Sequence, residues 1–175
     1  KNFTEQQIKS STIFTVIGCN FINCLAGDNK RGGAIYFVYN NDIGNCHVTV
    51  YSSTFDKCRA INGDGGAIFV CKKIGMTDFD PNHTLINSFN SSYCCYSNCT
   101  AYGVNSNEGY GPVMFIFASQ IEIYYSTAVE CPAKNEQSYG AQIDLKSYEI
   151  FSSYINSTKG KSEYCCAIEY RQANK

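Results

Sequence analysis

The feature that most constrains the fold of this chain is a motif that occurs five times. Each copy centres on an anchor residue, and a small residue stands five positions before the anchor in every copy. The anchors are Cys24, Cys58, Cys99, Cys131 and, in the fifth copy, Ser157. In the first four copies an alanine follows two positions later. A motif that recurs along the chain in this way is typical of solenoid proteins, whose stacked repeats share one continuous core.

Two further columns of like residues accompany the anchors. Three positions before the anchor, most copies carry an aromatic residue, and the series is Phe21, Phe55, Tyr96, Ala128 and Tyr154. A second block, which reads Gly-Gly-Ala-Ile in the first two copies, supplies the aliphatic series Ile35, Ile68, Met114, Ile143 and Ile168. Stacked repeats would pile these side chains into ladders and bury them between neighbouring coils. These columns therefore predict the core.

The spacing between anchors varies, with values of 34, 41, 32 and 26 residues. A repeat built from two packed helices would demand a nearly constant length, whereas a coil of short strands accepts variable loops at its corners. The 14 Tyr and 11 Phe residues also suit strands. We therefore predict an all-β parallel β-helix of about five coils, with two or three strands in each repeat. We expect it to form a single domain over residues 1–175, as a segment of a longer chain.

The pairing of F-x-x-C with G-G-A-I resembles the repeats of polymorphic outer membrane proteins, known from chlamydial surface proteins. The two clearest copies run from Phe21 to Ile35 and from Phe55 to Ile68. The cysteine-rich version is more similar to large surface proteins of trichomonad protozoa, although cysteine stands here where the bacterial repeats carry asparagine. The resemblance is good over residues 12–70 and looser over 88–170. It implies a right-handed, pectin-lyase-like β-helix, displayed at a cell surface and associated with adhesion.

The anchor cysteines are predicted to be stacked, reduced thiols that act as small apolar residues. In-register side chains on neighbouring strands keep their Cβ atoms too far apart for an unstrained disulfide. The vicinal pairs Cys94–Cys95 and Cys165–Cys166 should each direct one thiol outward. Such outward thiols could instead form bridges to a loop or to another chain. No metal site is expected, because no second matching C-x-x-C pair occurs.

The charge balance and the absence of certain motifs exclude several classes of partner. The chain contains 14 Lys plus Arg and 15 Asp plus Glu, with no basic run that could neutralise a nucleic-acid backbone. The longest apolar run, Val113 to Ala118, is too short to span a membrane. The Gly-Gly-Ala-Ile block should enter a strand rather than a helix, so no phosphate loop and no cofactor are predicted.

Five Asn-x-Ser/Thr sequons are candidate glycosylation sites: Asn2, Asn82, Asn90, Asn98 and Asn156. Asn98 and Asn156 directly precede an anchor, so we expect them to face outward when the anchor faces inward. Glycosylation of at least one sequon is predicted, and a simple polar outer surface is the alternative.

A carbohydrate-active enzyme, either a polysaccharide lyase or a hydrolase, is the principal functional alternative. Such chemistry needs acids clustered on one exposed sheet face. Only Asp144 and Glu169 are expected to stand on neighbouring coils, and we expect ordinary solvated positions for both. Asp78 and Asp80 could contribute to a calcium site, but further spaced oxygen ligands are lacking. Neither histidine has a serine or cysteine partner at a recognisable spacing, so a catalytic triad is not predicted.

We therefore expect a non-enzymatic scaffold, extracellular or at a cell surface, that contacts proteins or glycans. The ends of a β-helix present unpaired strand edges, which can recruit further strands. Self-association through these ends, up to a filament, is the remaining alternative.

Overall fold

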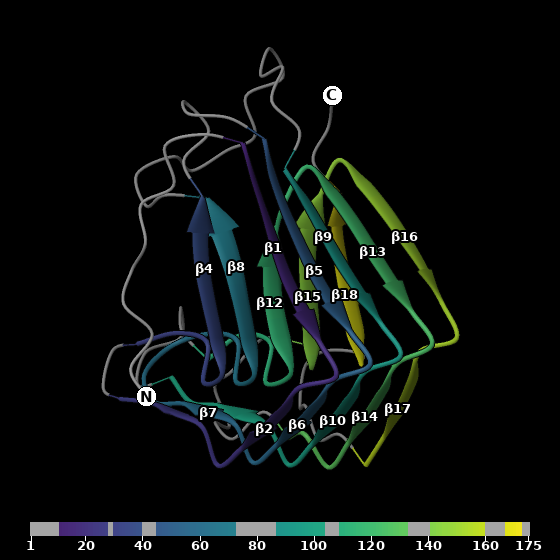
Figure 1. Cartoon of the computed structure of the whole chain (residues 1–175). Helices are drawn as coiled ribbons and strands as arrows, with labels where there is room; N and C mark the ends of the chain where they lie inside the picture. The colour runs from purple at the N-terminus through teal and green to yellow at the C-terminus, as the bar shows by residue number, and fades with distance from the viewer. Residues whose placement is uncertain are drawn as a thin grey trace.

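The computed structural model describes residues 11–27, 30–39, 45–72, 87–103, 109–132, 141–159 and 167–172. Every regular element in these ranges is a strand, and the strands form four parallel sheets. Neighbours within a sheet come from successive turns of the chain, so the molecule is a parallel β-helix of five coils (Figure 1). This architecture confirms the predicted fold class and the predicted number of coils.

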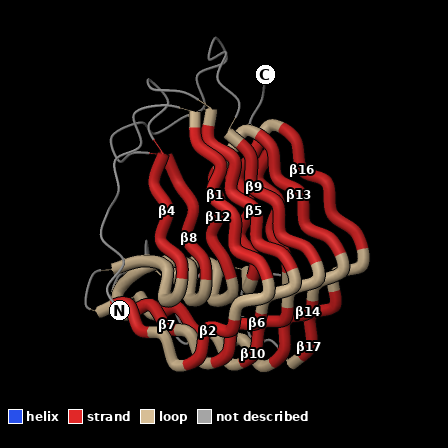
Figure 2. Tube along the Cα trace, viewed as in Figure 1, coloured by secondary structure: helices blue, strands red, loops and turns tan. Residues whose placement is uncertain are grey.

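The sheets differ in strand length, as Figure 2 shows. Sheet A contains β1 (Thr12–Ile17), β5 (Cys46–Tyr51), β9 (Ser88–Ser92), β13 (Gln120–Tyr124) and β16 (Glu149–Ser153). Sheet B contains β2 (Asn20–Ile22), β6 (Thr54–Asp56), β10 (Cys95–Ser97), β14 (Thr127–Val129) and β17 (Asn156–Thr158). Sheet C contains β3 (Leu25–Ala26), β7 (Arg59–Ala60) and β11 (Thr100–Ala101). Sheet D contains β4 (Ile35–Tyr39), β8 (Ile68–Lys72), β12 (Met114–Phe117), β15 (Ile143–Ser147) and β18 (Ile168–Gln172). The first three coils thus have four strands each, more than the predicted two or three.

Two sharp corners, between sheets A and B and between sheets B and C, are each made by one residue in the left-handed conformation. At the A–B corner these residues are Gly18, Ser52, Tyr93, Tyr125 and Tyr154. At the B–C corner they are Asn23, Lys57, Asn98, Glu130 and Lys159. Non-glycine residues seldom adopt positive φ, so its recurrence in two complete columns is a defining property of this fold.

In the first four coils the residue after each of these left-handed residues is Cys or Ser, and it is buried in coils two to four. Its side chain donates a hydrogen bond to the carbonyl oxygen two residues earlier, as Ser53 Oγ does at 2.9 Å and Cys99 Sγ at 3.4 Å. The same bond recurs for Cys19, Cys24, Cys58, Cys94, Ser126 and Cys131. The anchor thiols are therefore hydrogen-bond donors as well as small buried side chains, which corrects the purely apolar role expected from the sequence.

The fifth copy of the repeat is displaced from its position in the sequence alignment. Ser157 pairs with Ala128 and so lies in the aromatic column, three positions before the anchor column. Tyr154 instead lies at the A–B corner, where its ring stacks on Tyr125 at a centroid distance of 4.7 Å. The assignment of Ser157 as an anchor was wrong, because the strand pairing fixes the register. The inner position accepts a serine because the side chain of Gln142 reaches it and accepts a hydrogen bond from Ser157.

The core consists of columns that cross the coils. The rings of Phe21, Phe55 and Tyr96 stack with centroid distances of 4.8 and 4.9 Å. In sheet D, the strand register places Ile35, Ile68, Met114, Ile143 and Ile168 in one column. Each methylene that these columns remove from water contributes about 0.8 kcal/mol.

The two glycines of the second block are each required for a different steric reason. The first glycine is left-handed at Gly32, Gly65 and Gly111. The second glycine lies against the next coil, because a Cβ atom on Gly66 would stand 2.1 Å from the Pro112 carbonyl oxygen. Only glycine fits at such a close approach of two backbones.

Replacement of Gly66 by alanine should lower the free energy of unfolding by about 1–3 kcal/mol, because the added methyl group overlaps backbone atoms that cannot move independently. Gly27→Ala is the matched control, since a Cβ atom at Gly27 has no neighbour within 4 Å. We expect the control to change stability by less than about 0.5 kcal/mol. Urea titrations of both variants measure this difference, and equal stabilities would contradict the steric explanation.

Candidate functional site

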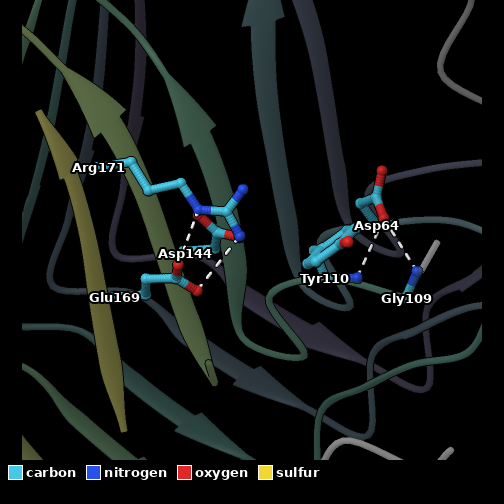
Figure 3. A network of polar contacts seen from close by, with 6 residues as sticks. All are labelled: Asp64, Gly109, Tyr110, Asp144, Glu169 and Arg171. Carbon is cyan, nitrogen blue, oxygen red and sulfur yellow. Dashed lines mark hydrogen bonds and ion pairs between the residues drawn. The ribbon is translucent and has the colours of Figure 1, made fainter. Parts of the chain in front are cut away.

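The acidic residues singled out as a possible catalytic pair lie on the outer side of sheet D. Asp144 and Glu169 are paired neighbours on β15 and β18. Arg171 bridges them, with Nη2 at 3.2 Å from Asp144 Oδ2 and Nε at 2.9 Å from Glu169 Oε1 (Figure 3). Asp144 is only 1% exposed, so the expectation of a solvated position was wrong for this residue. The sequence signal, two acids at equivalent positions, gave no indication of this burial or of the arginine between them.

The same network extends along the stack to the first coil. Asp64 Oδ1 accepts hydrogen bonds from the backbone N–H groups of Tyr110 and the preceding glycine, at 3.0 and 2.9 Å (Figure 3). Asp64 Oδ2 accepts one from Arg31 at 3.0 Å. The guanidinium of Arg171 lies 5.4 Å from the centre of the Tyr110 ring. Side chains from all five coils are thereby joined, which suits a structural tie between coils.

Burial controls the electrostatics of this network. It raises the pKa of Asp144 to about 7, and the negative charge of Glu169 adds to the effect while Arg171 opposes it. Burial also raises the pKa of Asp64, against the opposing effect of the N–H donors and Arg31. A carboxyl group with a raised pKa beside a second acid can act in proton transfer. Here, however, one guanidinium binds oxygen atoms of both acids, as in a structural ion-pair network.

The outer face of sheet A contains a serine–histidine contact that the sequence analysis missed. His47 Nδ1 lies 2.7 Å from Ser88 Oγ. The two residues are 41 positions apart, which is one coil, and this offset was the signal that could have identified the pair. Nucleophilic catalysis also needs free N–H donors for an oxyanion. The backbone of β9 is paired with strands on both sides, so the contact fits better as a side-chain link between coils.

Three further possibilities concern a metal site, the acids and the histidine of the long loop, and a membrane-spanning helix. Within the described ranges, no group of three His, Cys, Asp or Glu side chains is arranged to hold a metal ion. Asp78, Asp80 and His83 lie outside the described residues. Over the part of the chain that the structure describes, no helix is long and apolar enough to cross a bilayer.

The sequons fall on different surfaces. Asn98 and Asn156 are exposed, Asn98 at the B–C corner and Asn156 in β17 on the outer side of sheet B. Asn90 is partly exposed, and its Nδ2 donates a hydrogen bond to Glu122 at 3.0 Å. Asn2 and Asn82 lie outside the described residues. The geometry therefore leaves Asn98 and Asn156 as the most accessible of the described sequons.

The cysteines within the described ranges are all free thiols: Cys19, Cys24, Cys46, Cys58, Cys71, Cys94, Cys95, Cys99 and Cys131. Cys94 is buried and Cys95 exposed, as strand alternation requires, while Cys165 and Cys166 lie outside the described residues. Burial raises the pKa of Cys71 to about 11 and also raises the pKa of Cys94. A raised pKa leaves little thiolate at neutral pH, so these thiols should be poor nucleophiles.

A row of exposed tyrosines follows the A–B corner, and the sequence analysis did not single it out. The rings of Tyr93, Tyr125 and Tyr154 are stacked, with centroid distances of 5.0 and 4.7 Å. Tyr51 meets Tyr93 edge-on at 5.5 Å. Their exposed fractions are 41% for Tyr51, 53% for Tyr93, 48% for Tyr125 and 73% for Tyr154. We call these four residues the tyrosine ladder. Its sequence signal is a tyrosine directly before Cys94 and Ser126.

Comparisons with protein-family models, with curated proteins and with solved structures gave no match. The class of the protein, a five-coil parallel β-helix, therefore rests on its own strand pairing.

The network on sheet D predicts a specific pH dependence. Because the pKa of Asp144 in the folded protein lies above its usual value, the folded chain binds a proton that the unfolded chain has released between about pH 4 and 7. The stabilising contribution of this proton is complete below that window and is lost as the pH rises through 7. Asp144→Asn should remove this part of the pH dependence.

Urea titrations between about pH 5 and 8 test the effect, within the window set by the two pKa values. The control is Glu130→Gln, which removes an exposed ion pair with Lys159 and should preserve the slope. Identical pH profiles for Asp144→Asn and the unmodified protein would contradict the role of Asp144.

The burial pattern also predicts which thiols react. Iodoacetamide should modify the exposed Cys19 and Cys95 in the folded protein, whereas Cys99 and Cys131, both 0% exposed, should react on the order of a hundredfold more slowly. Peptide mass spectrometry measures each rate, and labelling in urea provides the control in which all of these thiols react. Comparable native rates at Cys95 and Cys99 would show that the corner thiols are not enclosed.

Proposed function

We propose that this protein is a non-enzymatic scaffold at a cell surface or in the extracellular space, and that it contacts proteins or glycans through the tyrosine ladder. The observation that carries the proposal is the exposure of four tyrosines in a continuous row over coils two to five. Contiguous exposed apolar patches mark interaction sites, and tyrosine is enriched among the residues that dominate binding energy.

The corner does not need tyrosine for its own stability. Ser52 occupies the left-handed position in the second coil, and Gly18 occupies it in the first. A small residue therefore satisfies the backbone there, and an exposed ring adds apolar surface in contact with water. An interaction with a partner explains this surface better than the fold does.

The extracellular location rests on two supporting observations. Asn98 and Asn156, both within sequons, are exposed and accessible to a glycosyl group. The repeat motif also resembles polymorphic outer membrane protein-like surface proteins, for which display and adhesion are expected. The specific proposal is therefore a surface protein with polymorphic outer membrane protein-like repeats.

The rival function, cleavage of polysaccharides, is disfavoured by the contacts of its best candidate residues. Arg171 binds both Asp144 and Glu169, and Asp144 is almost completely buried. Incubation with acidic and neutral polysaccharides, followed by measurement of new reducing ends or unsaturated products, would detect turnover. Turnover that Glu169→Gln abolishes would replace the scaffold proposal.

Binding through the ladder can be tested with the double variant Tyr125→Ser, Tyr154→Ser. Beads coated with the protein are passed over immobilised proteins, neutral glycans and acidic glycans. We expect retention on at least one surface, with a loss of about tenfold or more in the variant. The control is Tyr36→Ser, which removes a 39% exposed ring stacked on Phe69 in sheet D. Retention that does not depend on the ladder would contradict the proposal.

A further inference from the structure

We propose that the ligand of the tyrosine ladder is an uncharged polysaccharide that lies along the axis of the stack. This inference rests on the proposed binding role of the ladder and adds the chemistry of the ligand. It comes from the charge of the two flanking sheets, from their hydrogen-bonding side chains and from the regular repeat of the rungs.

The strands on both sides of the ladder are poor in positive charge. None of the ten strands of sheets A and B contains Lys or Arg, and the described residues of the A–B corner contain none. Glu122 and Glu149 project outward from sheet A. Asp56 projects outward from sheet B, where Lys57 at the B–C corner pairs with it at 3.7 Å. A sulfated or uronic-acid chain would meet the carboxylates of sheet A on strands that contain no Lys or Arg, so electrostatics disfavours polyanions at this face.

The outward side chains of sheet A suit hydroxyl groups. Asn90 Nδ2 donates to Glu122 Oε2 at 3.0 Å, and Gln120 Nε2 donates to Glu149 Oε2 at 2.8 Å. A carboxylate offers about four acceptor positions, so each acid can accept further hydrogen bonds from a ligand. Paired amides and carboxylates, fixed by their own contacts, form a preorganised polar surface beside the aromatic row.

The ladder repeats one chemical group once in each coil. Each of coils two to five contributes one ring, and the centroids of neighbouring rings are 5.5, 5.0 and 4.7 Å apart. The rungs thus cover roughly 14 Å at about 4.8 Å per coil. A polymer with similar units can contact successive rungs in the same way, and the binding of each unit then favours that of the next.

The orientation of the rings also fits this ligand. The stacked rings of Tyr93, Tyr125 and Tyr154 present their edges and hydroxyl groups, since their faces cover one another. Tyr51 is turned by 71° relative to Tyr93, and Tyr154 is 73% exposed, so aromatic surface is open at both ends of the row. Tyrosine supplies an apolar ring together with a polar tip, and a sugar chain likewise combines C–H and O–H groups.

The test measures binding of the whole chain to dextran, galactomannan, polygalacturonate and heparin by affinity electrophoresis. We expect binding to a neutral polymer, little change with added salt, and a loss of about tenfold or more in Tyr125→Ser, Tyr154→Ser. Tyr36→Ser should bind like the unmodified protein. Serine at both replaced positions matches Ser52, so the corners should still form, and thermal unfolding verifies this.

The outcomes separate this inference from the proposed function. Ladder-dependent binding to polygalacturonate or heparin, or to an immobilised protein alone, would overturn the neutral-glycan assignment and leave the binding role of the ladder intact. Neutral-polymer binding that survives the double variant would place the site elsewhere. Failure of every probe, proteins included, would overturn both.

Discussion

The hydrogen bond at the corners is the interaction on which the rest of this structure depends. A left-handed residue bends the chain sharply at the corner, and the Cys or Ser that follows donates a hydrogen bond to the carbonyl oxygen two positions earlier. The backbone N–H of that residue can in turn bond to the equivalent side chain of the next coil, as Cys19 does with Ser53 at 3.1 Å. Buried polar groups need such partners, because an unmatched one costs about 1–3 kcal/mol. The corners therefore turn tightly without leaving their backbone unsatisfied.

This arrangement explains why cysteine and serine alternate in the column at the A–B corner. Both are small donors, and each reaches the carbonyl oxygen two positions earlier, as Cys94 and Ser126 show on neighbouring coils. Six of the described cysteines thus have a structural role at the corners: Cys19, Cys24, Cys58, Cys94, Cys99 and Cys131. The exact stacking of corners also aligns whatever projects outward from them, so a tyrosine at the left-handed position of three successive coils produces a stacked row.

The charged side chains on the outer side of sheet D and those on the outer side of sheet A make different contacts. On sheet D, the guanidinium of Arg171 binds the carboxyl groups of both Asp144 and Glu169, and burial makes this network sensitive to pH. On sheet A, the outward carboxylates of Glu122 and Glu149 accept hydrogen bonds from amide side chains, and none of its strands contains Lys or Arg. An ion-paired network stabilises the stack, whereas a polar face beside aromatic rings is suited to recognition.

The sequence by itself determined the repeat, the β class and most of the inner columns, because side chains that stack on their own equivalents must recur at equivalent positions. It placed Phe21, Phe55 and Tyr96 in one ladder and Ile35, Ile68 and Ile143 in another, as the strand register has them. It failed at Ser157, because one small residue resembles another and only the pairing of β14 with β17 fixes the register. The burial of Asp144 was decided by the tertiary structure alone. The contact of His47 with Ser88 and the tyrosine ladder leave signals in the sequence, but only the tertiary structure shows that these side chains meet. Each depends on which residues face each other across coils, and that depends on loop lengths and corner geometry that no local pattern encodes.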